Sequence, residues 1–236
     1  MYLFAHVLSG ILLGTVFFYL LQDRRVFPVC IAGALLPDLI DKPLAVLFPE
    51  LFGASRTLAH AFLFFLGILL VALVLWHYRQ NLLGVAFACS VLLHQVLDST
   101  WNIPAIWLFP LLGPFPVIIV PDYVRHSLWM ELSSPSELAF ALASCLLLAA
   151  WYPEWIAGYM PRLTARHLTV LRMVAAAILG TFGFIFLVYG LQNASGSFLA
   201  PEYAPLTSTM AGILALLGAT ALAVLCLSRS PKSIPR

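Results

Sequence analysis

Seven long apolar stretches dominate the sequence, and each is close to the length that crosses a lipid bilayer as one helix. They cover residues 2–21, 26–40, 58–77, 82–98, 136–152, 168–191 and 207–228. A transmembrane helix needs about 17–25 mostly apolar residues, or fewer where one end is buried in protein. Charged residues make up only 9% of the chain, against about 25% in soluble domains. The sequence therefore predicts an all-α polytopic membrane protein, a transmembrane bundle of about seven helices.

The stretch between the fourth and fifth apolar runs, residues 99–135, is crowded with proline and aromatic side chains. The prolines are Pro104, Pro110, Pro114, Pro116 and Pro121, and the aromatic residues include Trp101, Trp107, Phe109, Phe115, Tyr123 and Trp129. Because proline interrupts regular helix, this stretch predicts an irregular cap over one end of the bundle. Its aromatic residues fit either a belt at the membrane interface or the walls of a groove for an acyl chain.

Two parts of the chain differ in their content of ionisable residues. We expect residues 1–152 to form a helical core that includes the cap, and residues 153–236 to add two transmembrane helices packed on it. The last two apolar runs contain small residues that favour close helix packing. These residues are Gly180, Gly183, Gly212 and Gly218.

Lysine and arginine are distributed unevenly when the seven runs are threaded alternately through a bilayer. One side collects Arg24, Arg25, Arg79, Arg162, Arg166, Arg172, Arg229, Lys232 and Arg236, and the other has Lys42, Arg56 and Arg125. Short cytoplasmic loops are enriched in these residues, so the pattern predicts a cytoplasmic C-terminus and an N-terminus outside. The basic residues form no patch, which argues against nucleic acid as a partner and leaves membrane lipid.

Seven polar residues lie at matching ends of the first four runs. They are His6 in the first run, Asp38 and Asp41 at the end of the second, Arg56 and His60 at the start of the third, and His94 and Asp98 at the end of the fourth. In the alternating threading all seven fall towards the outer face. The spacings of three and four residues place each pair on one helix face. We expect a break or a bent turn at Pro37, which aims the two acids inward.

The free-energy cost of placing ionisable side chains in a membrane indicates that these seven residues form one common site. An ionisable side chain deep in the membrane costs on the order of 2.5–3.5 kcal/mol unless something compensates it. A divalent cation would satisfy three imidazoles and three carboxylates, and this mixed set suits zinc, or else manganese or iron. Six donors exceed one four-coordinate zinc, so either more than one ion is bound or some residues orient the ligands. A metal ion that activates water predicts hydrolysis.

The order of these residues also resembles a known pattern. The matching positions are His6, Leu36-Pro37-Asp38 with Asp41, Arg56 followed by His60, His94 with Asp98, and Pro110 beyond them. They resemble the YdjM-like family of membrane-bound metal-dependent hydrolases, which is similar in turn to zinc-dependent phospholipase C. The resemblance covers roughly residues 1–115. Two positions depart from it, because Ala61 stands where the family has serine and Asn102 where it has glycine.

We therefore expect an enzyme that hydrolyses a phosphate or carboxylic ester of a lipid or lipid-linked substrate. The expected metal ligands are His6, Asp38, His60, His94 and Asp98. Asp41 is expected to be a further ligand or the base that orients the water, and Arg56 to receive the anionic group of the substrate. Four more residues are candidates for a further ligand or a general acid, namely Asp122, His126, Glu131 and Glu137.

Two other functions fit the same residues. A metal-ion or proton transporter would use the His/Asp cluster as a relay, and would have polar residues at successive depths through the bundle. A non-catalytic scaffold would use a bound metal to hold helices together, with a closed coordination shell. Simpler interpretations of single residues are an interfacial His6, an Asp38 that caps a broken helix, an Asp41 paired with Lys42, and an Arg56 that anchors the helix at the interface.

Overall fold

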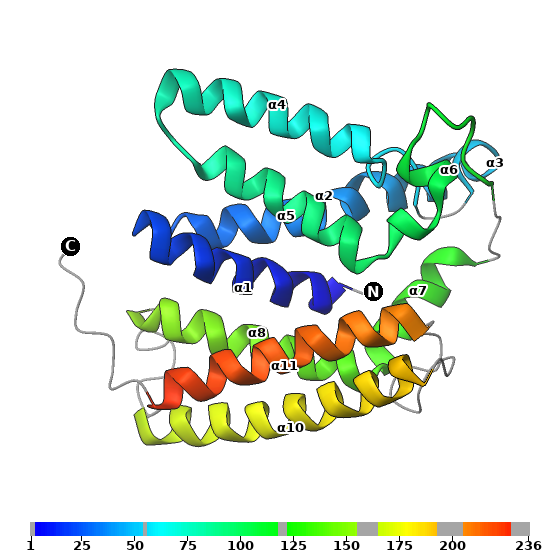
Figure 1. The fold of residues 1–236 in the computed structure, drawn as a ribbon. Helices are drawn as coiled ribbons and strands as arrows, with labels where there is room; N and C mark the ends of the chain where they lie inside the picture. The colour runs from blue at the N-terminus through cyan, green and yellow to red at the C-terminus, as the bar shows by residue number, and fades with distance from the viewer. Residues whose placement is uncertain (1–2, 54–55, 118–121, 155–164, 193–204, 228–236) are drawn as a thin grey trace. The chain divides into compact units, whose positions relative to one another are not determined.

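The computed structural model describes residues 3–53, 56–117, 122–154, 165–192 and 205–227, and within these ranges every regular element is a helix (Figure 1). Each predicted apolar stretch contains one long helix. These helices are α1 (Leu3–Leu21), α2 (Val26–Leu47), α4 (Phe62–Arg79), α5 (Leu83–Leu97), α8 (Pro135–Trp151), α10 (Ala165–Leu191) and α11 (Pro205–Leu227). The all-α class is confirmed.

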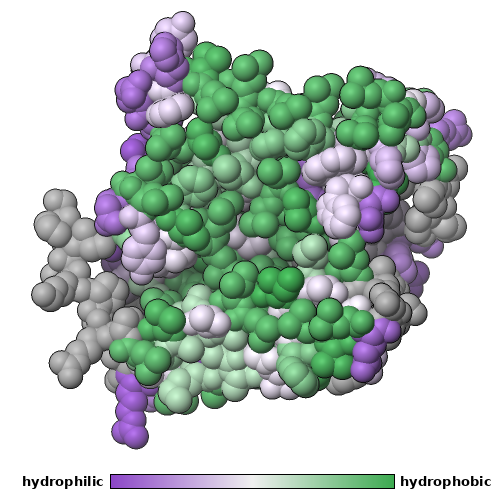
Figure 2. Space-filling view, viewed as in Figure 1, coloured by the Kyte–Doolittle hydropathy of each residue, from purple (hydrophilic) through white to green (hydrophobic). Residues whose placement is uncertain are grey.

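Length and apolar composition identify the helices that can cross a membrane. Four qualify among the described residues, namely α1, α4, α10 and α11, and a fifth is added if residues 123–133 and 135–151 count as one span. Hydrophobic residues cover the visible helix faces, and hydrophilic residues lie mostly near helix ends (Figure 2). α2 falls outside this set although it has 22 residues, and α5 has only 15. Both therefore rely on protein neighbours for part of their burial.

The chain forms two compact units, Met1–Ser134 and Pro135–Arg236. The expected boundary at residue 152 comes later than this division, so α8 belongs to the second unit. In that unit α8 contacts both α10 and α11. A side chain at Gly183 or Gly212 would collide with the opposite helix of the α10–α11 pair, which is the close packing that the sequence predicts. Gly180 faces open space instead.

Helices α1, α2 and α5 approach one another closely in the first unit, because small residues line their contacts. A Cβ atom added at Gly10 of α1 would lie 2.9 Å from the carbonyl oxygen of Cys30 in α2. One added at Gly33 of α2 would lie 2.6 Å from the carbonyl oxygen of Phe87 in α5. Ser90 reinforces the second contact, because its hydroxyl donates to the carbonyl oxygen of Cys30 at 2.5 Å. The polar groups on these three helices are thereby brought within reach of one another.

Helix α4 packs against α5 through an apolar core. Its buried members are Phe65, Ala72, Ala88 and Val91. The opposite face of α4 is lined by exposed apolar residues, including Leu70 at 64%. That face suits contact with lipid rather than with water.

The predicted cap contains short helices, and part of it is regular. A 3₁₀ turn, η1 (Thr100–Asn102), follows α5, and then α6 (Pro104–Trp107). Helix α7 (Tyr123–Ser133) is a regular helix that the proline-rich composition did not predict, while residues 118–121 lie outside the described ranges. The Trp107 ring lies 5.1 Å from that of Phe62 between centroids, which joins the cap to the start of α4. A short helix, α3 (Pro49–Phe52), follows α2.

Two local expectations about helix ends need correction. Helix α2 continues through Pro37 and Pro43 to Leu47, so it does not break at the first proline, although Asp38 and Asp41 are both buried as expected. Helix α4 begins at Phe62, so Arg56 and His60 precede it and do not share a helix face. In the first case the preceding turns of α2 pack on α1 and α5, and these tertiary contacts outweigh the helix-breaking tendency of proline.

Candidate metal centre

The buried histidine and carboxylate side chains of the first unit gather in one place. Within its described residues they are His6, Asp38, Asp41, His60, His94 and Asp98. One ligand atom from each of Asp38, His60, His94 and Asp98 lies within 4.8 Å of the other three. Helix α2 provides Asp38, the segment before α4 provides His60, and α5 with its C-terminal cap provides His94 and Asp98. The expectation that these four side chains meet is therefore fulfilled.

A backbone carbonyl determines which nitrogen of His94 faces the group. His94 Nδ1 lies 2.6 Å from the carbonyl oxygen of Ala34 in α2. A carbonyl oxygen only accepts hydrogen bonds, so Nδ1 carries the hydrogen. In the neutral ring this leaves a lone pair on Nε2, the state in which histidine binds a metal ion.

Asp41 has the same effect on His60. The His60 Nδ1 atom lies 2.7 Å from Asp41 Oδ2. The same carboxylate accepts the backbone N–H of Thr57 at 2.7 Å and that of Ala59 at 3.0 Å. A carboxylate with three such donors is acceptor only, so His60 Nδ1 carries the hydrogen and Nε2 has the lone pair. Asp41 thus orients His60, and its oxygens are directed at these donors.

The distances between the ligand atoms fit a single ion. His60 Nε2 and His94 Nε2 are 3.1 Å apart. Asp38 Oδ1 lies 3.8 Å from the first of these atoms and 3.9 Å from the second. For Asp98 Oδ2 the corresponding distances are 3.6 and 4.0 Å. Metal-to-ligand bonds of about 2.0–2.2 Å place tetrahedral ligand atoms roughly 3.3–3.6 Å apart. Two nitrogen and two oxygen donors therefore lie close to the spacing that one metal ion needs.

His6 lies against this group from the side of α1. Its ring stacks on that of His94, with centroids 3.8 Å apart and planes at 26°. Its Nε2 atom lies 3.2 Å from Asp98 Oδ1, the oxygen that does not face His60. The other ring nitrogen, Nδ1, has no hydrogen-bond partner among the described residues. The 3.2 Å distance suits both a ligand neighbouring Asp98 and a side chain that holds Asp98 in place.

Each carboxylate of the group lies beside a basic side chain. Lys42 Nζ lies 2.7 Å from Asp38 Oδ2, one helical turn further along α2. Arg56 Nε lies 3.0 Å from Asp98 Oδ2. The side chains of Lys42 and Arg56 are each 33% exposed, whereas those of Asp38 and Asp98 are 8% and 3% exposed. The two cations therefore occupy the side of the group that opens to the surface.

The segment that carries His60 is held in place by both flanking helices. Asp41 of α2 binds its backbone N–H groups, as described above. From α5, Gln95 Nε2 donates to the carbonyl oxygens of Ala59 at 2.9 Å and Ala61 at 3.0 Å. Gln95 is fully buried. The non-helical backbone between Arg56 and Phe62 thus has protein partners in place of water, as a membrane environment requires.

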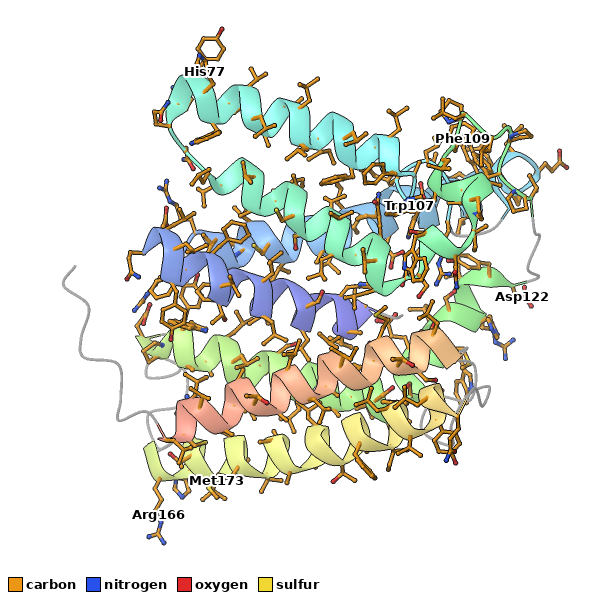
Figure 3. All side chains as sticks on the ribbon, viewed as in Figure 1. His77, Trp107, Phe109, Asp122, Arg166 and Met173 are labelled. Carbon is orange, nitrogen blue, oxygen red and sulfur yellow. The ribbon has the colours of Figure 1, made fainter. Side chains whose placement is uncertain are left out.

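The four further candidates do not join this group among the described residues. Asp122 is the residue before α7, and His126 donates its backbone N–H to the Asp122 carbonyl oxygen at 2.9 Å. Glu131 is also on α7, and Glu137 lies in the first turn of α8, in the second unit. His77 is at the end of α4 remote from Trp107 and Phe109, as expected for an ordinary end-of-helix residue (Figure 3).

Sequence reasoning missed two contributors that a spacing argument could have found. Lys42 is four residues after Asp38, the separation that brings side chains together on a helix. Gln95 directly follows His94 inside an apolar stretch, where a polar amide needs partners. The Ala34 carbonyl gives no sequence signal, because its role depends on how α2 and α5 pack.

Comparison with protein families matches residues 1–189 to the YdjM inner membrane protein family. The chain belongs to this family. The match extends well beyond the 115 residues over which the sequence pattern was recognised, and it covers the whole candidate metal centre. No curated protein and no solved structure matches the chain. For this YdjM family member, the similarity to zinc-dependent phospholipase C stays a prediction.

Proposed function

We propose that this YdjM family protein is a metal-dependent hydrolase that cleaves a phosphate or carboxylic ester of a lipid or lipid-linked substrate. The observation that carries the proposal is the pair His60 and His94, whose Nε2 atoms face each other beside two carboxylates. Zinc best suits this set of nitrogen and oxygen donors, and manganese or iron are the alternatives. When bound, such a cation lowers the pKa of water and polarises the ester.

The chain's own residues hold the ligands and bind the substrate. The Ala34 carbonyl and Asp41 fix the hydrogen positions of the two imidazoles, and His6 supports Asp98 from the side. Arg56 uses only Nε for Asp98, and among the described residues its terminal nitrogens have no partner. They are therefore the groups that bind the anionic oxygen of the ester. Hydrolysis joins the water oxygen to carbon or phosphorus, breaks the ester bond and passes a proton to the departing alkoxide.

The distribution of polar groups supports an enzyme over a transporter. A relay for ions or protons needs ionisable side chains at successive depths. In the described part of the first unit, every buried histidine and carboxylate side chain belongs to the metal centre or contacts it. Hydrolysis at one fixed position needs no such relay.

We further propose that the N-terminus and the centre lie towards the outer face and that the C-terminus is cytoplasmic. The support is the asymmetry of basic residues, of which Arg24, Arg25 and Arg79 lie at helix ends away from the centre. Four residues in that count lie outside the described ranges, namely Arg162, Arg229, Lys232 and Arg236. Reporter fusions after α1 and after α2 test this, because the first should report the cytoplasm and the second the outside.

Purified protein loaded with zinc, manganese or iron should hydrolyse at least one member of a panel of phosphate and carboxylic esters in mixed micelles. The His94→Ala variant should have no activity, because it lacks one of the four ligands. His77→Ala is the matched control and should keep full activity. Equal product formation by wild type and His94→Ala under every metal condition would contradict the proposal.

A further inference from the structure

Lys42 connects the metal centre to an apolar groove on the first unit. The groove lies between the C-terminal half of α2 and α7 and has a volume of about 440 Å³. Its walls include Val46, Leu47 and Leu128, with Glu131 as an acidic member. Lys42 lines the groove and also contacts Asp38 of the centre at 2.7 Å. A molecule in the groove would therefore have one end beside the metal ligands.

A wider depression of about 1210 Å³ lies next to the groove. Val46, Tyr123, Val124 and Leu128 line both hollows, so the two adjoin. Leu47 is 67% exposed and Leu128 54%, which leaves apolar surface uncovered along this path. Ligand pockets in proteins commonly have volumes of about 300–1,000 Å³, so the narrower hollow is large enough for part of a hydrocarbon chain.

The charges at the centre indicate which end of a ligand lies beside Lys42. Three carboxylates, those of Asp38, Asp41 and Asp98, face two cations, Lys42 and Arg56. Both cations lie on the exposed side of the centre, and a bound divalent cation would add two positive charges behind them. Positive charge in this position attracts an anion. A phosphate ester is anionic, whereas the bond of a carboxylic ester is neutral.

We propose that Lys42 and Arg56 together bind the phosphate of a membrane phospholipid, and that the groove between α2 and α7 holds one of its acyl chains. This inference rests on the proposed function and narrows its substrate to a phosphate ester that carries a hydrocarbon chain. The two cations are equally exposed, and each contacts a different carboxylate of the centre, so both present positive charge to an anion that binds beside the metal ligands. Glu131, in the groove wall, disfavours a second anionic group there.

Binding, rather than turnover, tests the inference. The probe is a phosphonate analogue of dihexanoyl phosphatidic acid. Its carbon–phosphorus bond resists hydrolysis, so the protein cannot release the headgroup. Inorganic phosphate and neutral dihexanoylglycerol serve as comparison ligands. Titration calorimetry on the metal-loaded, full-length protein in detergent should show that the phosphonate binds more tightly than either, because it uses the cations and the groove together.

Three substitutions locate the binding. Lys42→Met should weaken phosphonate binding by about tenfold or more, the effect of losing one charge-assisted contact, and should leave dihexanoylglycerol unaffected. Leu128→Asn should weaken binding of the phosphonate but not of inorganic phosphate. Glu131→Gln removes a negative charge from the groove wall and leaves the Lys42–Asp38 pair in place, so it should tighten phosphonate binding. Arg79→Met, which removes a cation at the far end of α4, is the matched control and should change nothing.

The outcomes separate the inference from the proposed function. Unchanged phosphonate affinity in Lys42→Met with its metal still bound, or in Glu131→Gln, would overturn the inference and leave the metal centre intact. Inorganic phosphate that binds as tightly as the phosphonate would overturn the role of the groove. A wild-type protein that binds no metal would overturn the proposed function itself.

Discussion

The Nε2 atoms of His60 and His94 lie 3.1 Å apart, although 34 residues separate them in the chain. Each ring donates from Nδ1 to an oxygen, so neither Nε2 atom has a hydrogen to offer the other in the neutral state. Two facing lone pairs repel each other. A cation bound between the rings and the nearby carboxylates would attract both lone pairs and so remove the repulsion.

The first prediction concerns metal content. The purified protein should carry close to one divalent metal ion per chain, and His94→Ala and Asp98→Ala should each lower the content to background, because each removes one of four donors. Elemental analysis of the detergent-solubilised variants measures this. His77→Ala should match the wild type. Full metal content in both ligand variants would refute the assignment.

Proton competition should make metal binding depend on pH. Metal binding needs an unprotonated Nε2 on both His60 and His94, so the apparent affinity should fall as the pH decreases. Competition with a fluorescent zinc indicator at several pH values gives the profile. His77→Ala should follow the wild-type curve. An affinity independent of pH across the range in which imidazole titrates would show that these rings are not ligands.

Replacing Asp41 by asparagine should weaken metal binding without removing a ligand. Asparagine keeps the size of the side chain, but its neutral amide is a weaker acceptor for the His60 Nδ1 hydrogen and for two backbone N–H groups. Loss of a group that orients a ligand costs about 10–100-fold in metal affinity. Asp23→Asn, in the exposed turn before α2, is the control and should bind metal normally. Wild-type affinity in Asp41→Asn would rule out the orienting role.

Gln95→Leu should lower both stability and metal affinity. The leucine side chain leaves the carbonyl oxygens of Ala59 and Ala61 without their donor, and each buried unsatisfied group costs about 1–3 kcal/mol. Thermal unfolding in detergent, with and without zinc, measures both effects. Gln80→Leu at the exposed end of α4 is the comparison and should leave metal affinity unchanged. An equal loss in the two variants would mean that Gln95 has no specific role.

A methyl group at Gly33 should disturb the centre from a distance. In Gly33→Ala the new Cβ would lie 2.6 Å from the Phe87 carbonyl oxygen, so α2 and α5 must separate. Overpacking of this kind costs about 1–3 kcal/mol, and here it also moves Asp38 away from His94. Gly67→Ala, with no atom within 4 Å of the new Cβ, should be neutral or slightly stabilising. Unfolding midpoints and metal affinity of both variants test the contrast.

The sequence was sufficient to predict the long helices and the side chains that gather at the candidate centre, for a simple reason. Apolar stretches of membrane length have few alternatives to helix, and an ionisable residue among them requires a partner. His60, His94 and Asp98 were therefore recognisable from their isolation in apolar surroundings. The spacing of His94 and Asp98 also gave the correct shared face, because α5 is regular up to Leu97.

Other features depended on contacts between segments distant in sequence. Pro37 has a strong local preference for ending a helix, but α1 and α5 pack around α2 and the helix continues. Arg56 and His60 look like the start of the next helix, yet Asp41 and Gln95 bind the backbone around them in a turn. The role of Asp41 was open for the same reason, since only the fold shows which donors reach its oxygens.

The turn that presents His60 has a consequence for how the protein matures. Its shape is imposed from α2 before it and from α5 after it, so the imidazole reaches its position only once α5 has docked beside α2. A nascent chain that stops after α4 would therefore expose a pair of acids but no binding site. If the centre binds metal as proposed, capture of the ion requires that the first four long helices have already assembled.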